Sequence, residues 1–151
     1  MKYSGAYGIV LALHLLTVAF VVGPAAIAAS TSGRLAKQGR VDALRDASDS
    51  TRKYTLATLA TVLLGMGLVG LGDVGDQWSY FQPWISVSLA LAVVAVGLVM
   101  AVVVPGQAAA ADALAEERDP GSALKRISVG AGLASLSWAV IIVLMVLKPG
   151  A

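Results

Sequence analysis

The chain has 151 residues, of which 58% are hydrophobic and only 13% are charged, and its mean hydropathy is +0.80. A soluble domain carries about 25% charged residues, so this composition excludes an ordinary water-soluble enzyme, and its hydrophobicity excludes a disordered chain. The absence of cysteine excludes disulfides, thiolate metal sites and cysteine nucleophiles, and a formal charge of +2 is too small to indicate nucleic-acid binding.

Four apolar segments are long enough to cross a membrane, since a spanning helix needs about 20 mostly apolar residues. They are residues 9–29, 55–72, 84–104 and 127–147, and none contains Asp, Glu, Lys or Arg. Backbone polar groups must pair internally in lipid, so such segments form helices, and their lack of alternating polarity excludes a barrel. We therefore expect one all-α domain over residues 1–151, a polytopic up-down bundle of four transmembrane helices.

The first segment also resembles a secretory signal peptide, because Ala26-Ile27-Ala28 follows an apolar run. However, the run is longer than the roughly 7–15 residues of such a peptide. The strongly basic stretch also lies after the run rather than before it. We therefore expect residues 9–29 to remain in the protein as a membrane anchor.

Basic residues predict the orientation of the chain, because they accumulate in cytoplasmic loops. The loops at 30–54 and 105–126 contain nine of the eleven Lys and Arg residues, and the other two are Lys2 and Lys148. We expect both loops in the cytoplasm and both termini outside it. The expected location is the plasma (inner) membrane of a bacterium.

The two halves of the chain share a design. Each has an aromatic entry, a span that ends near a proline (Pro24 or Pro105), a charged connection, a basic pair and a returning span. We therefore expect two tandem helical hairpins. The charged connections contain helix-forming runs at 39–45 and 108–117, and the turn at 119–121 is expected to end the second run.

His14 is the one ionisable side chain within the predicted spans. Such residues are costly in lipid and indicate function by default. Three roles are open to it: a structural hydrogen bond to a neighbouring helix, a ligand to haem, a metal or a quinone, and a proton relay, for which the spans offer no partner carboxylate. A bis-histidine haem within one chain is excluded, because the chain has a single histidine. We predict no cofactor, with haem or a metal at His14 as the alternative.

The two sides of the first span differ in character. At about 100° per residue, His14, Thr17 and Pro24 share one side, which is the candidate intramembrane polar site. Pro24 also removes the helical donor to the Phe20 carbonyl, which predicts a kink. The opposite side carries small residues, which let another helix approach closely in a homo-oligomer or with a partner membrane protein. These residues are Gly8, Ala12, Ala19 and Gly23.

Small residues also form stripes on the other three spans, and we expect these stripes to be packing faces. The alternative is a polar pore or substrate groove that their Ser and Thr residues line. They are Thr58, Thr61, Gly65 and Gly72 on the second span, Ser86, Ala90, Gly97 and Ala101 on the third, and Ser128, Ala131, Ser135 and Ala139 on the fourth. The glycines of residues 65–70 fit the dinucleotide-binding spacing, but they lie within a span rather than after a strand, which excludes that function.

The first span, Tyr7-Gly8-Ile9-Val10-Leu11-Ala12-Leu13-His14-Leu15-Leu16-Thr17-Val18-Ala19-Phe20-Val21-Val22-Gly23-Pro24, resembles a known group. Together with four spans in a short chain, it is similar to the domain of unknown function 2269 family of small predicted integral membrane proteins. A similar early histidine occurs in membrane domains of the copper-resistance D type, whose further polar positions this chain lacks. The resemblance implies the architecture and no particular activity.

These observations favour a non-enzymatic accessory or scaffold subunit of the membrane, with the lipid bilayer as its surroundings and no catalytic residue or metal-ligand set. One alternative is a small transporter or channel that acts as a homodimer. The absence of a carboxylate from the spans counts against a resemblance to small multidrug exporters, which need one. The other alternative is a redox subunit that binds haem, a metal or a quinone through His14.

Overall fold

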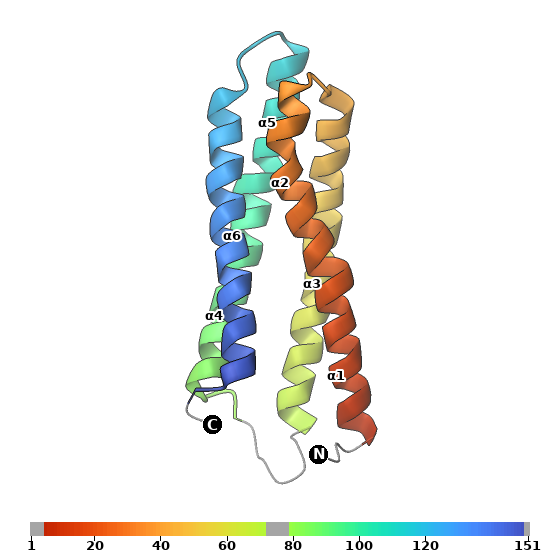
Figure 1. The fold of residues 1–151 in the computed structure, drawn as a ribbon, viewed down its shortest axis with the longest axis vertical. Coiled ribbons are helices and arrows are strands. Elements are labelled where there is room, and N and C mark those ends of the chain that lie inside the picture. Colours follow the sequence, from red (N-terminus) through yellow and green to blue (C-terminus); the bar gives the residue numbers. More distant parts are fainter. Residues whose placement is uncertain (1–4, 72–78, 150–151) are drawn as a thin grey trace.

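The structure, a computed structural model, describes residues 5–71 and 79–149 (Figure 1). Apart from short turns and connections, these residues are helical, and they contain no strand. Four helical segments within them are long and apolar enough to cross a membrane, namely Gly5–Lys37, Val41–Leu71, Pro83–Ala115 and Gly121–Leu147. The predicted all-α bundle of four spanning helices is confirmed, and the chain is a multi-pass membrane protein.

Two of the four segments contain a π-helical turn that divides them. The first segment consists of α1 (Gly5–Thr17), η1 (Val18–Val22) and α2 (Gly23–Lys37), and the second is α3 (Val41–Leu71). The third consists of α4 (Pro83–Leu98), η2 (Val99–Val103) and α5 (Val104–Ala115), and the fourth is α6 (Gly121–Leu147). We call Gly5–Leu71 the first hairpin and Pro83–Leu147 the second hairpin.

The helices run alternately up and down, so α1 begins and α6 ends at the same end of the bundle (Figure 1). We call the half of the bundle at this end the terminal half. The other half contains the connections 38–40 and 116–120 and every charged residue of the described chain except Lys148. We call it the charged half.

The two connections of the charged half begin with the same hydrogen-bonded turn. After α2, the N–H of Arg40 donates to the Leu35 carbonyl across Gly39, whose φ is 64°. After α5, the equivalent turn forms across Glu117, whose φ is 55°. Both are Schellman motifs, which end a helix at a residue in the left-handed conformation. The expected helix over 39–45 is therefore wrong at its start, because the turn at Gly39 delays α3 to Val41.

The helices are longer than the predicted spans 9–29, 55–72, 84–104 and 127–147, which lie within them except for Gly72, which is outside the described residues. The regions 30–54 and 105–126, expected as loops, are mostly helical. A segment of 33 residues is about 50 Å long, against about 30 Å for the hydrocarbon core. Hydropathy thus marks only the apolar part of each helix.

The hydrophobic core lies in the charged half and the centre of the bundle and is built mostly from alanine. Its fully buried members are Leu44, Ala95, Val103, Ala110 and Ala111. Such small side chains let helix backbones approach closely. At Gly106 of α5, an added Cβ would lie 2.9 Å from Cγ1 of Ile127 on α6. In α1, by contrast, the buried residue is Tyr7.

The small-residue stripes predicted for the third and fourth spans are wrong about the buried face. Small residues occur on several sides of these helices, so they do not mark one face. The predicted positions that are exposed are Ser86, Ala90, Gly97, Ala101, Ser128, Ser135 and Ala139, whereas Ala131 is half-buried. The buried faces instead contain Ser88, Ala92 and Ala95 of α4 and Gly130, Ala134 and Ser137 of α6.

A π-helical turn precedes each mid-helix proline. The N–H of Gly23 donates to the Val18 carbonyl, and the N–H of Val104 donates to the Val99 carbonyl, so each bond spans five residues. Pro24 and the corresponding proline of the second hairpin follow directly, and they lack the N–H that would continue the ladder. The irregularity expected at Pro24 is therefore a π turn. Its repetition supports the prediction of two similar hairpins.

Candidate functional site

His14 forms a hydrogen bond within the first hairpin. Its Nδ1 lies 2.8 Å from the carbonyl oxygen of Thr61 on α3. A carbonyl can only accept, so Nδ1 carries the proton and donates. The ring also lies against Gly65, where an added Cβ would be 3.0 Å from Cε1 of His14. The expectation that His14 bonds to a neighbouring helix is confirmed, and Gly65 provides the space for its ring.

The other two residues of the predicted polar site do not join His14. The hydroxyl of Thr17 donates to the backbone carbonyl of His14, 2.8 Å away, within the same helix. Pro24 lies ten residues further along the chain, which corresponds to about 15 Å of helix. The predicted site is therefore not one site. His14 forms a hydrogen bond to α3, and Pro24 follows the π turn further along the helix.

The predicted small-residue face of the first span lies at the surface. Ala12 and Ala19 are exposed, and Gly8 and Gly23 are half-buried. An added Cβ at Gly23 would meet nothing within 4 Å. This face is therefore open to lipid or to a second protein, and its role in association stays a prediction.

A buried glutamine connects the two hairpins in the charged half. Gln107 of α5 is fully buried, and its Nε2 lies 2.8 Å from Oγ of Ser32 and 3.2 Å from Oγ1 of Thr51. The same nitrogen is 3.3 Å from the Ala28 carbonyl. Close by, the hydroxyl of Ser48 donates to the Val104 carbonyl over 3.1 Å. These bonds fasten the second hairpin to α2 and α3 of the first.

Hydroxyl side chains continue from this cluster along the buried face of α3. The spacing of three or four residues keeps them on one side of the helix. All are buried, and they are Ser48, Thr51, Thr55, Thr58 and Thr61. We call these five residues, together with Ser32 and Gln107, the polar seam. Within the described residues, Oγ1 of Thr55, Oγ1 of Thr61 and Oε1 of Gln107 are buried without a hydrogen-bond partner.

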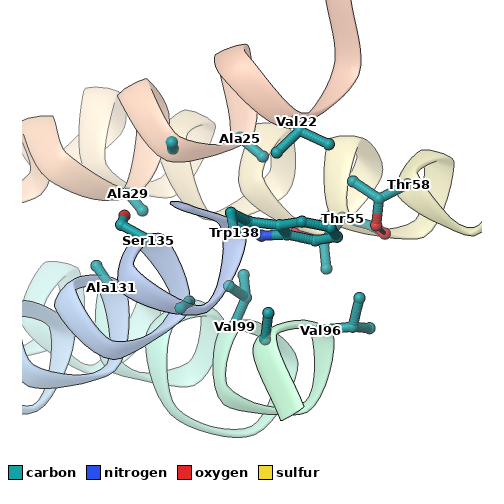
Figure 2. A pocket seen from close by; sticks show the side chains of 13 residues that line it. Val22, Ala25, Ala29, Thr55, Thr58, Val96, Val99, Ala131, Ser135 and Trp138 are labelled. Atoms are coloured by element: carbon teal, nitrogen blue, oxygen red, sulfur yellow. Dashed lines mark hydrogen bonds between the residues drawn. The ribbon is translucent and has the colours of Figure 1, made fainter. Parts of the chain in front are cut away.

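A small cavity lies beside the middle of the polar seam, where the two hairpins meet. Thr55 and Thr58 line it from the first hairpin, and Val99, Ala134 and Trp138 line it from the second. Figure 2 shows the Trp138 side chain between the helices that carry Val22 and Val99. The cavity has a volume of about 20 Å³, which is enough for about one water molecule. The cavity is therefore too small for a larger molecule in this conformation.

The two hairpins associate less closely in the terminal half. There α1 packs against α3, and α4 packs against α6, with only minor packing between α3 and α4 (Figure 1). Among the described residues of α3, none after Thr61 is buried. Between Leu44 and Thr61, by contrast, one face of α3 is buried along its whole length. The polar seam thus runs from a closely packed half to the point where the two pairs separate.

The chemistry of the polar seam is neutral. Its hydroxyl and amide groups can donate and accept hydrogen bonds, and none of its members is charged. In the described residues, no group of three or more His, Cys, Asp or Glu side chains is placed to hold a metal ion. The seam therefore suits water or an uncharged polar molecule.

Sequence reasoning assigned Thr58 and Thr61 to a packing stripe of the second span and did not identify Gln107, Ser32 and Thr51. These three lie outside the predicted spans, in regions expected to face water, where polar residues carry no signal. Periodicity could have identified Gln107, because it continues the spacing of the buried Val103 and Ala110.

The architecture defines the class, a multi-pass membrane protein of two helical hairpins. A comparison of the chain with protein-family models, curated proteins and solved structures finds no match. The resemblance of the first span to the domain of unknown function 2269 family therefore stays a prediction.

Proposed function

We propose that this protein is a small membrane transporter that moves an uncharged polar solute along the polar seam. The observation that carries the proposal is the set of buried polar atoms without partners on Thr55, Thr61 and Gln107. Such an atom costs about 1–3 kcal/mol in a protein interior. Polar groups within membrane helices are retained where they line the path of a solute or ion.

The position of the cavity supports this proposal. Many transporters bind their substrate at the interface of two structural repeats. The cavity beside Thr55 and Thr58 lies between two similar hairpins, at the middle of the polar seam. Trp138 adds an aromatic wall opposite these hydroxyl groups. A molecule with one polar and one apolar side matches this lining.

The distribution of contacts supports a movement of one hairpin against the other. The hydrogen bonds of Gln107 and Ser48 join the hairpins in the charged half. A π turn followed by proline interrupts the backbone ladder once in each hairpin. Release of the Gln107 bonds, with bending at these turns, opens the seam toward the charged end. The seam holds no carboxylate, so the proposed transport is not driven by protons that bind one.

The distribution of basic residues supports an orientation for this transporter. With nine basic residues against two, the charged half faces the cytoplasm and both termini lie outside it. Reporter fusions after Asp76 and after Ala151 should then give extracytoplasmic signals. Cytoplasmic signals at both positions would reverse the orientation.

A swelling assay tests transport directly. Liposomes that contain the protein should swell faster than empty ones in glycerol, urea or ribitol. Thr55→Val and Thr58→Val should each slow the uptake about fivefold, the factor for one lost hydrogen bond of about 1 kcal/mol. Thr31→Val is the matched control, because Thr31 does not belong to the polar seam and does not line the cavity. Equal swelling with and without protein for all three solutes contradicts the proposal.

The hydrogen bond of His14 favours a second candidate function, a haem-binding redox subunit. Donation from Nδ1 to the Thr61 carbonyl leaves the Nε2 lone pair as the acceptor of the ring. Histidine ligands to metals are commonly oriented in this way. A single histidine suits haem, whose porphyrin supplies four nitrogen donors itself. The purified protein should then show a Soret band that His14→Ala removes and Thr17→Val leaves unchanged.

A flat visible spectrum would refute the redox function. If solute uptake is absent as well, the accessory or scaffold role becomes the favoured function. Its predicted contact is the face formed by Gly8, Ala12, Ala19 and Gly23. In that case Ala12→Leu and Ala19→Leu should disrupt an oligomer without unfolding the chain.

A further inference from the structure

We infer that a groove on the outer side of the second hairpin is a binding site for an anionic phospholipid. The groove lies between η2–α5 and α6 and has a volume of about 480 Å³, within the range of typical ligand sites. Its lining residues are Ala101, Val102, Pro105, Gly106, Ala109, Ser122, Ala123 and Arg126. It is separate from the polar seam, so this inference does not rest on transport.

The groove is formed by the lack of side-chain bulk where α5 and α6 meet. Alanine occupies both sides of it, at Ala109 and Ala123. Gly106 forms part of its floor, and any side chain there would meet Ile127. Pro105 follows the π turn directly and is exposed along the groove. The result is a groove between the two helices rather than a flat surface.

The position of the groove matches the layers of a membrane. Its deep end, at Ala101 and Val102, belongs to the apolar span 84–104. Its other end, at Ala109 and Ser122, belongs to the charged half, and Arg126 directly precedes the apolar span that starts at residue 127. A molecule that fills the groove therefore has an apolar part in the hydrocarbon layer and a polar part among the headgroups. A phospholipid has this form.

The charge of the groove selects an anionic headgroup. Arg126 is its one charged lining residue, and no acidic side chain lines it. The ion pairs found in the described chain join Arg45 to Asp112 and Arg118 to Glu116, so neither neutralises Arg126. A guanidinium group binds phosphate oxygens in a two-pronged geometry, and the Ser122 hydroxyl one turn away can donate a further bond. Basic pockets between membrane helices bind acidic headgroups by this chemistry.

Lipid binding to the purified full chain tests this inference. Native mass spectrometry in detergent would measure the retention of dioleoyl phosphatidylglycerol and of dioleoyl phosphatidylcholine, which have the same acyl chains. The intact protein should retain phosphatidylglycerol about fivefold more tightly, the factor for about 1 kcal/mol per basic residue at the membrane surface. Arg126→Gln should remove this preference.

Lys125→Gln is the matched control, because Lys125 is exposed next to Arg126 but does not line the groove. It should keep the preference for phosphatidylglycerol. Ala109→Leu fills the groove and should reduce the retention of both lipids. Equal retention of the two lipids by the intact protein, or an unchanged preference in Arg126→Gln, overturns the inference. A loss of dimer mass in Ala109→Leu without a change in bound lipid also overturns it, because the groove then holds a second copy of the chain.

Discussion

The charged and terminal halves of this bundle are made from the same four helical segments but are held together differently. In the charged half, α2, α3, α5 and α6 share an alanine-rich core, and Gln107 connects the hairpins through buried hydrogen bonds. In the terminal half, α1 pairs with α3 and α4 pairs with α6. Each pair of helices stays packed together in the terminal half, but the two pairs pack less closely against each other there than in the charged half. Cohesion within a hairpin is thus separable from cohesion between hairpins, which is the property that a moving pair of hairpins requires.

The largest expected effect comes from removing the polar connection in the charged half. Gln107→Ala should destabilise the protein by about 2–3 kcal/mol, because it leaves a cavity and deprives Ser32 and Thr51 of their donor. Gln82→Ala is the matched substitution in the terminal half, where Gln82 is half-buried, and should cost less than about 1 kcal/mol. Unfolding in mixed micelles would measure both. Equal losses would contradict the difference between the halves.

Glycine substitutions sharpen the same comparison. Gly106→Ala places a Cβ 2.9 Å from Ile127 and should destabilise the bundle by about 1–3 kcal/mol through overpacking. Gly67→Ala in the terminal half meets nothing within 4 Å and should stabilise α3 by up to about 1 kcal/mol. The same unfolding measurement distinguishes them. If Gly67→Ala is the more harmful change, the terminal half is packed more closely than described.

The two helix-ending turns provide a comparison between the hairpins. Gly39→Ala should cost about 1 kcal/mol, because Gly39 has a left-handed φ of 64°. Glu117→Gly should stabilise the second turn by about 0.5–1 kcal/mol, since Glu117 adopts φ 55° without the freedom of glycine. In thermal unfolding, Gly39→Ala should lower the melting temperature and Glu117→Gly should raise it. Shifts of the same sign would mean that the two turns do not play equivalent roles.

The smallest expected effect concerns the hydrogen bond within the first hairpin. His14→Ala removes one bond to the Thr61 carbonyl, and such bonds in membranes average about 0.6 kcal/mol. The helical content and the association of the hairpins should remain unchanged by circular dichroism and cross-linking. If His14→Ala lowers the free energy of unfolding by more than about 2 kcal/mol, His14 stabilises more than the contact between α1 and α3.

Sequence patterns predicted the spanning segments well, because apolar length alone determines which helices lie in lipid. The same patterns predicted the hydrogen bond of His14, because an isolated polar group in a span must find a partner. They did not predict the charged half, where α2 and α5 continue past the hydrocarbon and bury Ser32 and Gln107. Burial there depends on tertiary contact, and hydropathy cannot report it.

The buried faces of α4 and α6 were predicted wrongly for a related reason. Ser86 and Ser135 are small but exposed, whereas Ser88 and Ser137 of the same helices are buried. Lipid-facing and protein-facing positions can both hold small residues, so size gives no direction. Which side of a helix is buried depends on where the other hairpin packs, and the sequence of one helix does not specify that.

Cysteine labelling tests the central claim, that the polar seam opens to water, most directly. The natural chain has no cysteine, so single substitutions give an unambiguous signal. Thr58→Cys places a thiol on the seam, and Leu59→Cys places one on the lipid-facing side of α3, where Leu59 is 48% exposed. We expect a charged, membrane-impermeant thiol reagent to modify Thr58→Cys in liposomes and to leave Leu59→Cys unmodified. A Thr58→Cys protein that remains unmodified from both sides of the membrane would contradict this claim.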